Sequence, residues 1–60
     1  MASDAILTYC STWRTLVEIA EYFPFGAGIV VAKMLRDGQL ERRERHPRGG
    51  GTIFEYRTVT

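Results

Sequence analysis

Arginine is the residue type whose numbers and spacing in this chain suggest a chemistry. From Glu41 to Arg48 there are four arginines and two glutamates, and three consecutive glycines, residues 49–51, follow. Guanidinium groups can neutralise phosphates, and a glycine-rich turn can approach a phosphate backbone closely. The same charges can also form a solvated surface, in which Glu41, Glu44 and Glu55 pair with arginines across strands. The stretch alone therefore leaves phosphate binding and an ordinary charged surface both open.

The residue types that enzyme active sites use are scarce. The chain has one histidine, His46, and one cysteine, Cys10, so it has no Cys/His cluster with metal-ligand spacing and no internal disulfide. The GAG stretch at 26–28 is too short for a phosphate-binding loop, and no lysine follows it at the required spacing. We therefore expect no enzyme activity, no metal and no cofactor. We expect Cys10 to be a small buried hydrophobic residue.

Length and charge limit the fold more than the function. Sixty residues with a net charge of +1 and 45% apolar content predict one globular domain, 1–60, whose small core leaves it marginally stable. No apolar run approaches the roughly 20 residues that span a bilayer, and the N-terminus lacks the basic region of a signal peptide. We expect a cytoplasmic protein without a membrane segment.

Three stretches with apolar residues at helical spacing predict the elements that position the arginines. The predicted helices lie at about 4–11, 15–23 and 26–37. In the second, Thr15 and Glu18 have the spacing of a capping box, and Pro24 ends the helix. Its apolar stripe consists of Leu16, Ile19, Ala20 and Phe23. The third ends at Gly38, a natural C-terminal cap.

After Gly38 the apolar period changes from helical to alternating, which predicts strands at about 39–45 and 52–59. Leu40, Phe54 and Tyr56 are expected to face the helices, because a hairpin alone is not stable. Alternation places Arg43 and Arg45 on one face and Arg42 on the other. The stretch TWR at 12–14 is a candidate third strand, with Trp13 in the core or covering the hairpin.

This order of elements resembles the winged helix-turn-helix family over nearly the whole chain, residues 6–58. TLVEIAEYF resembles the second helix of that family, and AGIVVAKMLRDGQLERRE resembles its recognition helix and the exit from it. RHPRGGGTIFEYR resembles the wing and its return strand. The resemblance implies an α+β fold, with a three-helix core and a C-terminal β-hairpin wing.

The resemblance also implies binding to double-stranded DNA, with the third helix in the major groove and the wing on the backbone or in the minor groove. The recognition-helix positions are Gly28, Ile29, Ala32, Lys33 and Arg36. The wing positions are Arg42, Arg43, Arg45, His46, Arg48, Gly49 and Gly50. Arg14 and Thr15, at the start of the second helix, are candidates for backbone contacts. A small transcriptional regulator, associated with the nucleoid, is the expected function.

The third helix departs from what sequence-reading members of the family usually carry. If Ala27, Val30, Val31 and Met34 face inward, the outward residues include Ile29 and Ala32, which have no hydrogen-bonding group for base edges. We therefore expect modest sequence specificity, with a pseudo-palindromic site if the chain forms a homodimer. The alternative is a winged-helix interaction module that binds a protein partner or a second copy through Ile29 and Ala32.

Overall fold

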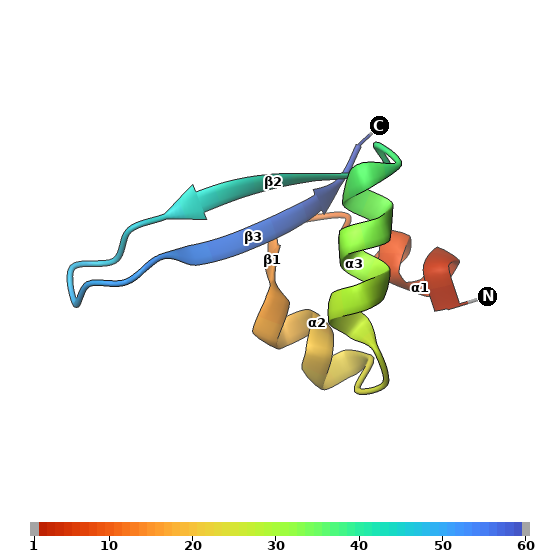
Figure 1. Cartoon of the computed structure of the whole chain (residues 1–60), viewed down its shortest axis with the longest axis horizontal. Helices are drawn as coiled ribbons and strands as arrows, with labels where there is room; N and C mark the ends of the chain where they lie inside the picture. Colours follow the sequence, from red (N-terminus) through yellow and green to blue (C-terminus); the bar gives the residue numbers. More distant parts are fainter. Residues whose placement is uncertain (1, 60) are drawn as a thin grey trace.

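A computed structural model describes residues 2–59, so the predicted domain limits 1 and 60 fall just outside the described residues. This part of the chain contains three helices and a three-stranded antiparallel sheet, which confirms the α+β class (Figure 1). The helices are α1 (Ala2–Tyr9), α2 (Leu16–Tyr22) and α3 (Ala27–Arg36), and the strands are β1 (Arg14–Thr15), β2 (Leu40–Arg45) and β3 (Ile53–Thr58). The element order is compatible with a winged helix. None of these helices is long and apolar enough to cross a membrane.

The start and end of α2 follow from local chemistry, as predicted. The Glu18 amide donates to the Thr15 hydroxyl oxygen over 3.1 Å, and the Thr15 amide donates to the Glu18 carboxylate over 2.9 Å. This capping box satisfies two amides at the helix start that have no partner within the helix. Phe23 has left helical geometry (φ −126°, ψ 81°) and ends the helix, because the α region is disfavoured for a residue that precedes proline.

Gly38 ends α3 in the left-handed conformation, with φ +79°. The Gln39 amide donates to the Met34 carbonyl over 2.8 Å, and the Gly38 amide donates to the Leu35 carbonyl over 3.2 Å. These two bonds form a Schellman motif, which satisfies carbonyls at the helix end. The turn directs the chain straight into β2.

The core lies where the three helices meet the base of the sheet. Its buried residues are Ile6, Cys10, Ile19, Ala27, Val31, Met34, Leu40 and Tyr56. The predicted inward stripe of α3 is confirmed, but that of α2 is partly wrong, because Ala20 is exposed and Leu16 is 38% exposed. The reason is that a helix of seven residues buries only a narrow stripe, here centred between Ile19 and Phe23.

The sheet has the strand order β1-β3-β2, and the β2–β3 hairpin extends well beyond the helices (Figure 1). Leu40 pairs with Thr58 and Arg42 with Tyr56, so these side chains share one face of the hairpin. Because Leu40 and Tyr56 belong to the core, we call this the helix-side face. Arg43 pairs with Glu55 on the opposite face. The predicted separation of Arg42 from Arg43 and Arg45 is confirmed.

Candidate nucleic-acid interface

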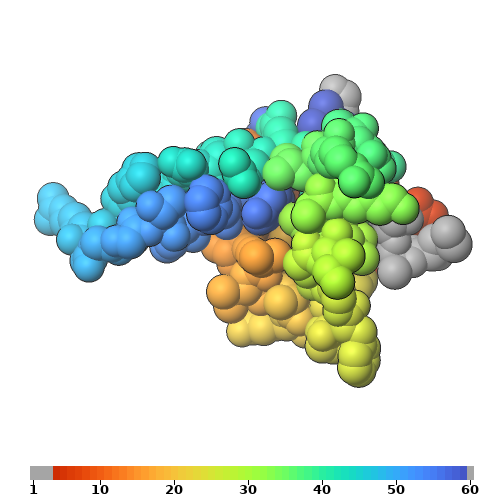
Figure 2. All heavy atoms as spheres, viewed as in Figure 1, coloured from red at the N-terminus to blue at the C-terminus, as the bar shows by residue number. Residues whose placement is uncertain are grey.

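The outward surface of α3 gathers all five residues predicted for the recognition helix. These residues, which we call the outer face of α3, are Gly28, Ile29, Ala32, Lys33 and Arg36, and they line one open groove. All five are exposed, and Ile29 is 79% exposed. The helix lies uncovered along the face of the molecule seen in Figure 2. These residues are exposed because of the helical period of the sequence: the buried residues Ala27, Val31 and Met34 occupy the opposite side of α3.

The two cations of this face, Lys33 and Arg36, are hardly neutralised by carboxylates of the chain itself. Within the described residues, Lys33 has no ion-pair partner, and the Arg36 side chain, 75% exposed, has only the adjacent Asp37 with Nε and Oδ1 3.7 Å apart. An exposed pair at that distance contributes little. Both cations lie in the last turn of α3, where they complement the helix dipole and remain available to an anion.

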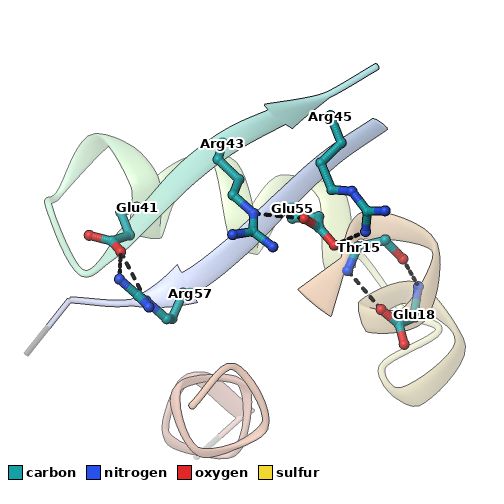
Figure 3. A network of polar contacts seen from close by, with 7 residues as sticks. All are labelled: Thr15, Glu18, Glu41, Arg43, Arg45, Glu55 and Arg57. Carbon is teal, nitrogen blue, oxygen red and sulfur yellow. Dashed lines mark hydrogen bonds and ion pairs between the residues drawn. The ribbon is translucent and has the colours of Figure 1, made fainter. Parts of the chain in front are cut away.

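Three arginines of the hairpin lie instead in a network on the face opposite the helix-side face (Figure 3). The carboxylate of Glu55, whose residue is only 5% exposed, accepts from Arg43 Nε over 2.8 Å and from Arg45 Nη1 over 3.2 Å. Arg57 Nε donates to the Glu41 carboxylate over 2.9 Å, and a second bond joins Arg57 Nη2 to the same oxygen. The arginine–glutamate pairing considered from the sequence is confirmed for these residues.

Trp13 completes this network. Two guanidinium groups contact its indole ring, with the Arg43 Cζ atom 4.3 Å and the Arg57 Cζ atom 4.5 Å from the ring centroid. We call Trp13, Glu41, Arg43, Arg45, Glu55 and Arg57 the clasp. The prediction that Trp13 covers the hairpin is confirmed, while its arginine stacking was missed because it depends on the register of three strands.

Each arginine of the clasp pairs with a glutamate of the clasp, and Glu55 pairs with two of them. The hydrogen bond from Arg43 and then that from Arg45 hold the pKa of Glu55 below its ordinary value, although burial acts in the opposite direction. Glu55 therefore stays ionised at neutral pH and keeps both arginines paired. Arg43, Arg45 and Arg57 consequently have partners within the fold before any ligand arrives.

The helix-side face and the tip of the hairpin carry the remaining predicted wing residues. The Arg42 guanidinium lies 4.9 Å from the Phe54 ring centroid, and neither Arg42 nor Arg48 has a carboxylate partner among residues 2–59. His46 Nε2 lies 3.7 Å from a Glu44 carboxylate oxygen. Gly49 and Gly50 form the exposed tip, where Gly50 (φ +92°) needs the left-handed conformation.

Arg14 and Thr15, the predicted backbone contacts, have roles inside the fold. Arg14 Nε donates to the Tyr9 carbonyl over 3.1 Å, and its guanidinium lies 4.4 Å from the centroid of the Tyr9 ring. Tyr9 in turn stacks on Tyr22 with centroids 4.5 Å apart. Thr15 uses its hydroxyl to cap α2. Neither residue lines the groove on the outer face of α3.

Residues 2–59 contain no group of three or more His, Cys, Asp or Glu side chains that could hold a metal ion. Cys10 is buried as predicted, and burial raises the pKa of its thiol against the opposing effect of Arg14. The chain has no match among protein-family models, curated proteins or solved structures. The outer face of α3 and the helix-side face of the hairpin are therefore the best-supported candidate site.

Proposed function

We propose that this chain is a winged-helix protein that binds double-stranded DNA and acts as a small transcriptional regulator. In this proposal the outer face of α3 enters the major groove and the β2–β3 hairpin is the wing that contacts the backbone. The observation that carries the proposal is the exposure of Lys33 and Arg36 on one open face of α3, next to a projecting hairpin with cations of its own.

The pairing pattern selects among the wing arginines. Arg42 and Arg48 have no carboxylate partner in the described residues, so they can approach a phosphate without giving up an existing ion pair. Arg43 and Arg45 would first have to leave Glu55. We therefore assign Arg42 and Arg48, with Lys33 and Arg36, as the main phosphate contacts. Of these four cations only Arg48 lies at the tip of the hairpin, where His46 and the Gly49–Gly50 backbone are its neighbours in the chain.

A salt titration tests the proposal directly. The purified chain is titrated against a fluorescent duplex of generic sequence at several salt concentrations. Four phosphate contacts predict a slope of log K against log salt of about −3.6, at roughly −0.9 per contact. Binding that does not change with salt contradicts a phosphate interface. Absence of binding even at low salt contradicts DNA binding altogether.

A second candidate function is supported by the 79% exposure of Ile29. An aliphatic side chain this exposed beside Ala32 also suits a hydrophobic contact with a protein, including a second copy of this chain. Sedimentation of the native chain and of Ile29→Asp separates the candidates. A dimer that Ile29→Asp dissociates, together with no duplex binding, favours the interaction module.

A further inference from the structure

The outer face of α3, which the proposed function places in the major groove, has an apolar N-terminal part and a cationic C-terminal part. Gly28, Ile29 and Ala32 occupy the first two turns of α3, whereas Lys33 and Arg36 lie in its last turn. Residues four apart on a helix are neighbours on its surface, so Gly28, Ala32 and Arg36 form one row and Ile29 and Lys33 form another. Each row is thus apolar toward the N-terminus and cationic toward the C-terminus.

Gly28 is an unexplained residue in this row. It lies within α3, where glycine is less favourable than alanine, and its φ is not positive. Apart from its chain neighbours and the backbone of its own helix, a Cβ atom added at Gly28 would meet no described atom within 4 Å. Neither backbone conformation nor crowding inside the fold therefore requires a glycine here. What Gly28 does provide is a point on the surface of α3 that has no side chain, so a ligand can approach the helix backbone closely there.

We propose that the outer face of α3 recognises the C5-methyl group of a pyrimidine in the major groove. This inference rests on the proposed function and names what that site reads. The C5-methyl of thymine is the apolar group that the major-groove edge of a standard base pair presents. Ile29 and Ala32 supply apolar contact for it, and Gly28 lets the base edge approach the helix backbone. Lys33 and Arg36 hold the flanking phosphates.

This arrangement agrees with how a recognition helix docks. The N-terminal residues of such a helix contact base edges, and the N-terminal part of α3 is the part that carries Gly28, Ile29 and Ala32. The expected preference is for thymine-containing steps, and 5-methylcytosine offers the same methyl group. The preference is modest, because the face supplies no hydrogen-bond pattern that fixes the rest of the base pair.

Uracil substitution isolates the methyl group. Alternating A·T and A·U duplexes of equal length differ only in the C5-methyl, so we expect the native chain to bind the A·T duplex about fourfold more tightly for each methyl contacted, the equivalent of about 0.8 kcal/mol. The salt slopes of the two duplexes should be the same. A G·C duplex with and without 5-methylcytosine then separates the two sources of the methyl group.

Variants assign the effect to residues. Gly28→Ala has room in the fold, so we expect its Tm to rise while its preference for A·T over A·U falls. Ile29→Ala should also lower the preference, since Ile29 is exposed and its loss leaves the core intact. Lys33→Ala is the matched control, and it should weaken both duplexes equally.

The possible outcomes distinguish the two proposals. Equal affinity for A·T and A·U duplexes, with salt-dependent binding retained, overturns methyl recognition and leaves DNA binding in place. Loss of binding to all duplexes overturns both. A preference that survives in Gly28→Ala and in Ile29→Ala overturns the assignment to this face of α3. A dimer that Ile29→Asp dissociates, with no discrimination between duplexes, makes the face a protein contact and overturns the inference.

Discussion

The arginines on the two faces of the β2–β3 hairpin differ in whether they have a carboxylate partner. On the clasp face, Arg43 and Arg45 donate to a buried carboxylate, and Arg57 is held by Glu41. On the helix-side face, Arg42 lies over the Phe54 ring and has no carboxylate partner in the described residues. The positive charge of the sequence is therefore divided into a part that holds the hairpin together and a part available to a ligand.

This difference teaches that the partners of an arginine, rather than its exposure, indicate its role. The side chains of Arg43, Arg45 and Arg57 are 46%, 60% and 44% exposed, so by exposure alone all three would qualify as ligand contacts. All three are paired with a glutamate of the hairpin, and Arg43 and Arg57 also contact the Trp13 ring, so they already have partners within the fold. The outer face of α3 has the converse property, since Lys33 and Arg36 are exposed and contribute little to the fold.

Removing the cations of α3 should have the largest effect on binding. Lys33→Ala combined with Arg36→Ala should weaken duplex binding by at least about 150-fold, because two lost hydrogen bonds to charged groups, at roughly 1.5–3 kcal/mol each, amount to at least about 3 kcal/mol. The salt slope should become less negative by about 1.8, or roughly 0.9 for each lost phosphate contact. Stability should change by less than about 0.5 kcal/mol, as for most surface substitutions. Fluorescence anisotropy across a salt series measures the affinity and the slope.

Arg43→Ala with Arg45→Ala is the matched control, since it removes the same charge from the clasp. It should lower the thermal stability, because Glu55 then remains buried without its partners, and it should leave the salt slope nearly unchanged. If this variant flattens the salt dependence as much as the α3 variant does, the clasp arginines contact phosphate and the division between the two faces is wrong.

Trp13 should have the largest effect on stability within the clasp. Trp13→Ala removes a half-buried indole together with two cation–π contacts, each worth about 0.5–1 kcal/mol at an exposed site. We expect a total loss of about 2 kcal/mol, below the roughly 3–5 kcal/mol of a fully buried tryptophan. Urea denaturation followed by circular dichroism measures it. Trp13→Phe, which keeps an aromatic ring, should recover part of the loss, and a neutral Trp13→Ala would contradict a structural clasp.

The contacts of the clasp could not be predicted from the sequence, whereas several local features could. The capping box of Thr15 and Glu18, the stop at Gly38 and the outward face of α3 were all predictable, because each depends on residues within about one turn of each other. The contact of Trp13 with Arg43 and Arg57 depends on the pairing of β1 and β2 with β3. Such long-range register is not encoded in local spacing.

One predicted site residue, Arg14, and one predicted core residue, Ala20, show the same limit. Arg14 is a cation beside the start of α2 and was a reasonable phosphate contact, but the fold brings it onto the Tyr9 ring. Ala20 fits the apolar stripe of α2, yet the short helix leaves it exposed. In both cases the packing of the whole fold, rather than local spacing, decided the outcome. DNA binding itself stays a prediction that the titrations above test.

Glu55 should make the stability of the fold depend on pH, with a smaller effect than the loss of Trp13. Its pKa is lowered in the folded chain, first by the Arg43 hydrogen bond, so the unfolded state takes up the proton more readily. The stabilisation is therefore fully present above the ordinary glutamate pKa of about 4.3 and is lost as the pH falls through the lower folded-state pKa. Thermal unfolding of the native chain and of Glu55→Gln between neutral and acidic pH measures this. The difference in Tm between them should shrink as the pH falls, and a constant difference would contradict the role of ionised Glu55.

The smallest effect, and the sharpest contrast between the two regions, should come from replacing arginine with lysine. Arg57→Lys keeps the charge but loses the stacking on Trp13 and the double hydrogen bond to Glu41, so we expect a loss of stability of about 0.5–1 kcal/mol with an unchanged salt slope. Arg36→Lys keeps the charge at an exposed position whose only ion pair is the long one with Asp37. The stability should therefore change by less than about 0.3 kcal/mol. Urea titrations of both variants, with duplex binding measured in parallel, make the comparison.

If Arg36→Lys weakens binding severalfold at an unchanged salt slope, Arg36 makes a bidentate contact that lysine cannot replace, such as one to guanine. If Arg57→Lys is as stable as the native chain, stacking on Trp13 contributes nothing, and the clasp reduces to its ion pairs.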